Sequence, residues 1–329
     1  MQFTSRPRPR RLLTTAAASI CIGAAIVCAD AGTAFGAEDP SAAPLPEMVV
    51  ATGGTAYEAS LAGSLGRPLA TGGVAGVALS RGGSLWVGSN PQPGDEWDAE
   101  WGQQWGLNSI CGYSVMRQPW SAAPLDISAG PTWTPLWLLS QGELDGPSCD
   151  AVATPDGNLA YMRMFVGSGT STKQLAVDPA SGAATVTTLT RGCWSLSFAA
   201  PARGASCVSR WYAPRGGGYD RVYAGSLTSR RLIGPKSQET FETAIDPTGS
   251  RVAYPVGNAL WSIASTGGRP RRLTKVPGRK NTFIEKVMWT RDGQALVMMR
   301  SQQVWVYRVA DGSLAMIMSG IDDFTVPPA

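Results

Sequence analysis

The 329-residue sequence contains no histidine. Histidine is the general base of Ser-His-Asp and Cys-His sites and the commonest protein ligand of metal ions, so all such sites are excluded. Charged residues are also scarce, at 16% of the chain. Catalysis is thereby left to carboxylate chemistry, and we expect a non-catalytic protein with no cofactor and no metal.

The chain begins with a segment typical of a secretory leader. Four arginines within the first eleven residues precede an apolar, alanine-rich stretch over 12–28, and small residues follow. This layout predicts a cleaved signal peptide over 1–36, exported by the general or the twin-arginine route, and a mature domain over 37–329. A retained membrane anchor is the alternative, although 17 residues is marginal for a span. We expect no integral membrane segment after cleavage and a secreted, extracytoplasmic protein.

Cysteine usage agrees with export. Two of the six cysteines lie in the predicted leader, and the even number that remains indicates two disulfides. Four cysteines allow three pairings. We expect those nearest in sequence to pair, Cys193 with Cys207 and Cys111 with Cys149. A zinc site is the alternative, and the lack of CxxC spacing argues against it.

The net charge of +4 hides a strong asymmetry. Residues 37–150 contain 12 acidic and 3 basic residues, whereas residues 151–329 contain 11 acidic and 21 basic residues. Such a dipolar chain can orient a charged partner. An unevenly charged, solvated surface is the alternative.

One pattern recurs along the chain: an apolar strand, a tight turn ending in glycine, and further apolar strands. The clearest copies span 152–157, 243–249 and 287–293, and weaker copies span 77–83 and 196–204. The turn glycines are Gly83, Gly157, Gly204, Gly249 and Gly293, at spacings of 74, 47, 45 and 44 residues. Spacings near 45 are typical of a four-stranded propeller blade.

The repeats resemble the PD40 repeats of TolB-type, WD40-like β-propellers. The resemblance rests on TPDGNLAYM at 154–162, DPTGSRVAYPV at 246–256 and TRDGQALVMM at 290–299, and only the first keeps the Pro-Asp-Gly of the family intact. It implies an all-β propeller of four-stranded antiparallel blades and protein binding in the cell envelope.

The mature length favours six blades, with seven as the alternative. We expect the tail over 321–327 to pair with residues 46–72 and close the ring, because an open propeller would leave exposed strand edges. A β-sandwich is the rival fold, and the regular spacing of the repeats argues against it.

An acidic, tryptophan-rich insertion near 91–110 interrupts the repeats. Its tryptophans are four residues apart and would share one face of a helix, with carboxylates among them. These residues are Trp97, Trp101, Trp105, Asp95, Glu96, Asp98 and Glu100. They predict a binding loop for a protein or, alternatively, for a glycan that two of the acids would hydrolyse. Packing of the tryptophans onto the propeller body is a further alternative, and the order of a calcium loop is absent.

A basic run over 269–280 places six cations in twelve residues: Arg269, Arg271, Arg272, Lys275, Arg279 and Lys280. We expect it to contact an anionic envelope polymer or membrane surface, with an exposed interblade loop as the alternative. Nucleic acid is not expected, because no nucleic-acid motif is present. The sequence as a whole predicts a secreted, non-catalytic propeller that binds a protein or cell-envelope polymer through loops on one face.

Overall fold

The computed structural model describes residues 44–89, 114–129, 134–135, 148–165, 169–177, 184–193, 195–200, 203–212, 218–235, 237, 240, 242–278 and 282–328. The predicted signal peptide and the tryptophan-rich insertion lie outside these residues, so both stay predictions. The domain boundary predicted at residues 36 and 37 is likewise untested.

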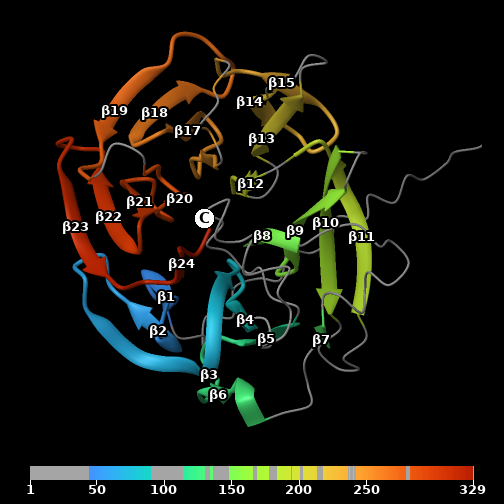
Figure 1. The fold of residues 1–329 in the computed structure, drawn as a ribbon, viewed down its shortest axis with the longest axis vertical. Helices are drawn as coiled ribbons and strands as arrows, with labels where there is room; N and C mark the ends of the chain where they lie inside the picture. Colours follow the sequence, from blue (N-terminus) through green and yellow to red (C-terminus); the bar gives the residue numbers. More distant parts are fainter. Residues whose placement is uncertain are drawn as a thin grey trace, which may run out of the picture. The chain divides into compact units, whose positions relative to one another are not determined.

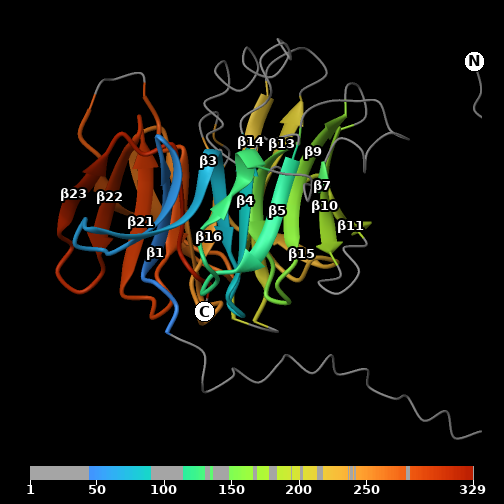
Figure 2. The same cartoon turned by 90° about the horizontal axis from the view of Figure 1, so that it is seen from below.

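The described chain is built from antiparallel β-sheets and one short 3-10 helix, η1 (Ile127–Ala129). Figure 1 shows the sheets arranged around a centre, with the end of the chain close to that centre. Seen from the side in Figure 2, the strands run between two faces of the molecule.

The first sheet contains both ends of the described chain. Its order is β24-β1-β2-β3-β4-β5-β7, and β6 pairs with β3 in parallel. The long strand β3 belongs to two parts of this sheet, since its first half pairs with β2 and its last residues pair with β4. The bounds are β24 (Asp323–Thr325), β1 (Met48–Thr52), β2 (Gly54–Ala59), β3 (Leu65–Leu79), β4 (Ser84–Ser89), β5 (Ser114–Pro119), β6 (Leu125–Asp126) and β7 (Thr134–Pro135).

The other four sheets have four strands each, and in each sheet the strand nearest the centre is the first in sequence. Two of them comprise β8 (Ser148–Ala153), β9 (Leu159–Phe165), β10 (Gly169–Val177), β11 (Ala184–Arg191), β12 (Ser195–Phe198), β13 (Ala205–Tyr212), β14 (Gly218–Gly225) and β15 (Arg230–Leu232). The remaining two comprise β16 (Ala244–Ile245), β17 (Arg251–Val256), β18 (Ala259–Ala264), β19 (Arg271–Lys275), β20 (Lys286–Trp289), β21 (Ala295–Arg300), β22 (Gln303–Arg308) and β23 (Leu314–Ser319).

The repeat turns fold as the sequence predicts. All five turn glycines have positive φ angles, between 70° and 106°, which glycine adopts without steric cost. A turn hydrogen bond joins Gly157 N to Thr154 O at 3.0 Å, and the equivalent bond joins Gly293 N to Thr290 O at 2.8 Å. Each turn connects the inner strand of a sheet to the next strand outward.

The inner strands form a closed ring. They contact one another in the order β24, β3, β8, β12, β16 and β20, and a hydrogen bond from Lys286 on β20 to Asp323 on β24 completes the circuit. Strand β24 also pairs with β1, opposite Val49 and Ala51. The predicted closure of the ring by the C-terminal tail is therefore confirmed. The number of blades stays a prediction, because the segments between β4 and β8 are described only in part.

The core lies between neighbouring sheets. Every residue of β21 is buried, and Val297 and Met299 pack in one cluster with Met48, Val50 and Phe324 from the first sheet. The opposite side of β21 belongs to a second cluster, shared with the preceding sheet. Burial on both faces explains why these strands lack the polar alternation of a half-exposed strand.

Candidate functional site

The sheets surround a central axis, and the inner strands line it. At one end of this axis, equivalent residues of three repeats lie close together. Ser195, Glu242 and Lys286 each lie four residues before the first residue of their repeat turn, which is Ala199, Asp246 or Thr290. They line a cavity of about 40 Å³, with room for about three water molecules. Val152, Ser197, Met288 and Thr325 complete much of its wall. We call this cavity the axial pocket.

The polar groups of the axial pocket are held by hydrogen bonds between different sheets. Ser195 Oγ donates to Glu242 Oε2 at 2.8 Å. Lys286 Nζ donates to Asp323 Oδ1 at 2.7 Å, and the second Asp323 oxygen, Oδ2, accepts from the backbone N–H of Val77 at 2.9 Å. Among the side chains that the structure describes, the pocket presents the carboxylate of Glu242 and the ammonium group of Lys286, both held by hydrogen bonds to neighbouring inner strands.

Asp323 is completely buried, whereas the Lys286 side chain retains 13% exposure. Burial raises the pKa of Asp323, because a carboxylate away from water loses solvation. The ammonium of Lys286 and the backbone amides of Val77 and Phe324 oppose this shift by favouring the charged form. Lys286 thus compensates a buried charge and also lines the pocket.

The other end of the axis is apolar. A second cavity of about 40 Å³ shares Val152, Ser197 and Met288 with the axial pocket. Its remaining wall comes from the ends of the inner strands and from the C-terminal residues Val326 and Pro328. The tail after β24 therefore lies at the apolar end, and Figure 2 shows the C-terminus at one face of the molecule.

The aspartates of the repeat turns serve the turns themselves. Asp246 accepts hydrogen bonds from the backbone N–H groups of Ser250 and Arg251, at 2.7 and 3.1 Å. Asp292 accepts one from the hydroxyl of Thr290 at 2.7 Å. Both carboxylates satisfy local donors, which accounts for aspartate in the repeat motif by turn chemistry alone.

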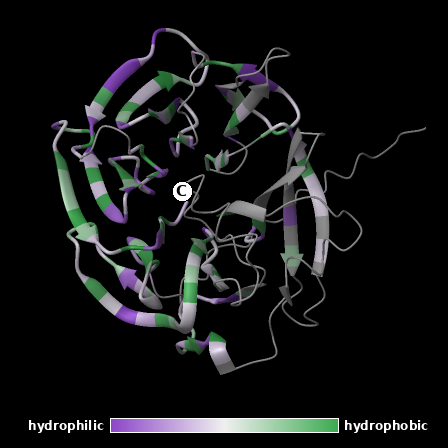
Figure 3. Cartoon of the chain, viewed as in Figure 1, coloured by the Kyte–Doolittle hydropathy of each residue, from purple (hydrophilic) through white to green (hydrophobic). Residues whose placement is uncertain are grey.

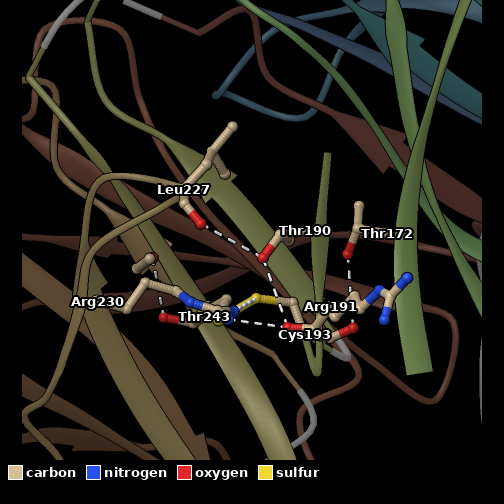
Figure 4. Close-up of a disulfide and its surroundings, with 9 residues drawn as sticks. Thr172, Thr190, Arg191, Cys193, Leu227, Arg230 and Thr243 are labelled. Carbon is tan, nitrogen blue, oxygen red and sulfur yellow. Dashed lines mark hydrogen bonds between the residues drawn. A yellow bond between two sulfur atoms is a disulfide. The ribbon is translucent and has the colours of Figure 1, made fainter. Parts of the chain in front are cut away.

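The predicted disulfide between Cys193 and Cys207 is present and closes a separation of 14 residues. Both residues are buried where the sheet of β8–β11 meets the sheet of β12–β15. Figure 4 shows the Arg230 guanidinium against this disulfide, donating to both sulfurs. Arg230 also donates to the carbonyl of Arg191 at 2.8 Å. The second predicted pair lies outside the described residues at Cys111.

The basic run does not form a single loop. Arg269 precedes β19, and Arg271, Arg272 and Lys275 lie on β19, the outermost strand of its sheet. All four side chains are exposed. Arg279 and Lys280 lie outside the described residues, as do the seven predicted ligand residues of the tryptophan-rich insertion, which are Trp97, Trp101, Trp105, Asp95, Glu96, Asp98 and Glu100.

Sequence reasoning missed the polar residues of the axial pocket. Ser195, Glu242 and Lys286 occupy one position of the repeat, and aligning the repeats on the first residue of each turn would have shown a polar residue at or just before the start of each inner strand. Asp323 follows no such turn. Its pairing with Lys286 depends on closure of the ring, which no local pattern reveals.

Within the described ranges, no cluster of three or more cysteine, aspartate and glutamate side chains is placed to hold a metal ion. In the same part of the chain, no helix has the length and apolar character needed to cross a membrane.

Comparison with solved structures finds propeller proteins. Tricorn protease is similar over 84% of this chain and 25% of its own, with a TM-score of 0.54 and 13% identity. A putative TolB from Agrobacterium tumefaciens is similar over 79% of this chain and 87% of its own, with a TM-score of 0.48 and 11% identity. TolB from Acinetobacter baumannii is similar over 53% of this chain, with a TM-score of 0.41 and 15% identity, and the chain spans 44% of its length.

No protein-family model matches the sequence. No curated protein matches it either. The comparisons thus concern the fold alone, and the β-propeller that the repeats predict is confirmed at that level.

Proposed function

We propose that this propeller is an extracytoplasmic, non-catalytic binding protein that receives a polar side chain of a partner protein at the axial pocket. The observation that carries the proposal is the meeting of Glu242 and Lys286 at one end of the axis, in a pocket bounded by inner strands. Opposite charges in one pocket suit the polar groups of a peptide chain, which combine donors and acceptors.

The pocket's hydrogen bonds support binding rather than catalysis. A carboxylate pair that hydrolyses a substrate needs both groups within reach of the reacting atoms. Asp323 is completely buried and bonded to Lys286 and Val77, so it cannot reach a ligand. Among the described side chains, Glu242 is then the carboxylate of the pocket that a ligand can reach.

Location outside the cytoplasm is supported by the disulfide. Disulfides persist in oxidising compartments and are rare in reducing ones. The leader-like segment over 1–36 points the same way.

Affinity capture tests the proposal. The purified protein is immobilised and exposed to an envelope extract, and the affinity of the retained partner is then measured for two variants. Glu242→Gln removes the negative charge of the pocket at nearly constant shape. Glu47→Gln is the matched control, because Glu47 is exposed and lies away from the axial pocket. It precedes β1, whose first residues pair with the end of β24 at the apolar end of the axis.

We expect Glu242→Gln to weaken binding about tenfold, as for the loss of one hydrogen bond to a charged group. The control variant should bind as the wild type does. A partner that binds both variants equally well, or the absence of any retained partner, would contradict the proposal.

A further inference from the structure

A second charged surface lies on the outside of the molecule, away from the axis. Strands β15 and β19 are the outermost strands of two successive sheets. Figure 3 shows both strands largely in hydrophilic colours, in contrast to the outer strand β23. Arg230 on β15 is exposed but donates to the disulfide sulfurs and to the carbonyl of Arg191. The other exposed cations of the two strands, together with one that precedes β19, are Arg231, Arg269, Arg271, Arg272 and Lys275. We call this set the basic edge.

The two sheets are connected at this surface. Arg231 Nη1 on β15 donates to the carbonyl of Thr266, in the turn before β19, at 2.8 Å. The guanidinium of Arg231 is thereby held beside the cations of the next sheet. The basic edge is one continuous feature across two blades, which the sequence run over 269–280 alone does not indicate.

Described carboxylates do not neutralise these cations. Between residues 184 and 278 the described acids are Asp220, Glu242 and Asp246. Asp220 and Asp246 are each only 2% exposed, and Glu242 lines the axial pocket. Arg67–Glu58, Arg251–Asp246 and Lys286–Asp323 are ion pairs between described residues, and none of them uses a cation of the basic edge.

The arrangement of the cations is linear. Strand β19 has an extra residue between Arg272 and Thr274, so the alternation of its side chains is interrupted there. Arg272 and Lys275 pair with Trp261 and Ala259 of β18 and lie on one side of β19, whereas Arg271 pairs with Ser262 and lies on the other side. Because β19 has a neighbour on one side only, both sets of side chains can reach a ligand that follows the edge. A flexible chain can follow such a line, whereas a flat surface would meet only part of it.

Four of the five cations are arginines. The planar guanidinium donates two parallel N–H bonds, a geometry that matches phosphate oxygens. Membrane binders combine such cations with several apolar anchors. Here Leu232, 45% exposed, is the exposed large apolar residue of β15, and β19 has none.

We propose that the basic edge binds a linear polymer that carries phosphate groups along its chain. The site is separate from the axial pocket and does not depend on the function proposed for that pocket. The polymer's charge complements the edge, and its repeated phosphates can meet arginines of both sheets at once.

Inorganic polyphosphate is the probe for this site, with affinity measured at low and moderate salt. The test variant is Arg269→Gln/Arg271→Gln/Arg272→Gln. The matched control is Arg203→Gln/Arg291→Gln/Arg308→Gln, which changes the net charge equally at exposed arginines outside the basic edge. Thermal unfolding checks that both variants are folded.

We expect the test variant to lose affinity roughly tenfold or more and to show a weaker salt dependence, while the control loses at most about threefold. Glu242→Gln should bind polyphosphate as the wild type does, which separates this site from the axial pocket. Equal losses in both triple variants would show a net-charge effect and overturn the proposal. So would the absence of binding at low salt.

Two further probes distinguish the partner. Poly-L-glutamate tests whether the edge selects phosphate, and vesicles of phosphatidylcholine and phosphatidylglycerol test whether it prefers a surface. The proposal requires that both bind more weakly than polyphosphate. Equal or tighter binding of either one overturns the assignment of the partner.

Discussion

The ammonium group of Lys286 contributes both to the axial pocket and to the stability of the fold. It lines the axial pocket and it donates at 2.7 Å to a carboxylate, that of Asp323, from which solvent is excluded. A buried carboxylate without its partner is strongly destabilising, since its charge is then uncompensated. The residue that makes the pocket polar is thus also part of what closes the ring.

We predict that Lys286→Met lowers the free energy of unfolding by about 3 kcal/mol at neutral pH. The double variant Lys286→Met/Asp323→Asn should recover much of this loss, because the asparagine is neutral and can still accept from Val77 N–H. Urea denaturation of both variants measures the difference. Equal stability of the single variant and the wild type would contradict the compensating role of Lys286.

The loss in Lys286→Met should depend on pH. Without the ammonium, burial raises the pKa of Asp323 further above its ordinary value of 3.8. A carboxyl with a raised native pKa stabilises the fold below its unfolded pKa, and this contribution disappears as the pH rises through the native pKa. We therefore expect the difference in free energy of unfolding between Lys286→Met and the wild type to shrink as the pH falls from neutral to about 4. Urea denaturation at several pH values measures it.

At the scale of single elements, the repeat turns combine a local and a long-range constraint. Gly249 has a φ of 75°, and a Cβ there would overlap the backbone carbonyl of Arg203 in the neighbouring turn. Gly267 has a similar φ of 88°, with no atoms within 4 Å of where a Cβ would lie. The two glycines thus share a backbone conformation but differ in surroundings.

We predict that Gly249→Ala destabilises the protein by about 1–2 kcal/mol more than Gly267→Ala does. Both variants carry the strain of a positive φ, so their difference isolates the clash with Arg203. Chemical denaturation of the pair measures it. Equal losses would mean that the turns do not touch in solution.

The disulfide staples the segment before β12 to β13, next to the sheet of β8–β11. We predict that Cys193→Ala/Cys207→Ala lowers the free energy of unfolding by roughly 3 kcal/mol, as for a loop of this length. Unfolding under non-reducing conditions compares the variant with the wild type. Peptide mapping that finds unpaired thiols at both cysteines in the native protein would refute the bond itself.

At the scale of the whole molecule, the C-terminal strand joins the two ends of the domain. Strand β24 pairs with β1 and contacts β3, and Phe324 is completely buried in the cluster that connects the first and last sheets. The ring therefore closes only when the last residues of the chain are in place. This closure removes sheet edges that would otherwise be exposed.

We predict that deleting residues 321–329 costs at least about 3 kcal/mol, since the burial of Phe324 alone is lost. The newly exposed edge of β1 should also cause self-association, detectable by light scattering after size-exclusion chromatography. Deleting only residues 327–329 is the control and should leave the stability and the mass in solution as they are in the wild type. Identical behaviour of the two truncations would contradict closure by β24.

The sequence by itself determined the repeat turns, the propeller class, the Cys193–Cys207 bond and the tail that closes the ring. The first three depend on residues close together in sequence or on a spacing that recurs, and the closing tail was predicted because an open ring would leave exposed strand edges. A turn glycine shows its function through the backbone conformation that it alone adopts easily.

Only the tertiary structure decided which distant residues meet. The pairing of Lys286 with Asp323, the shared strand β3 and the meeting of Arg231 with the turn at Thr266 all join different sheets. Their geometry follows from how successive sheets pack around the axis. No local pattern encodes that packing, because it depends on the burial of apolar side chains between all the sheets of the ring together.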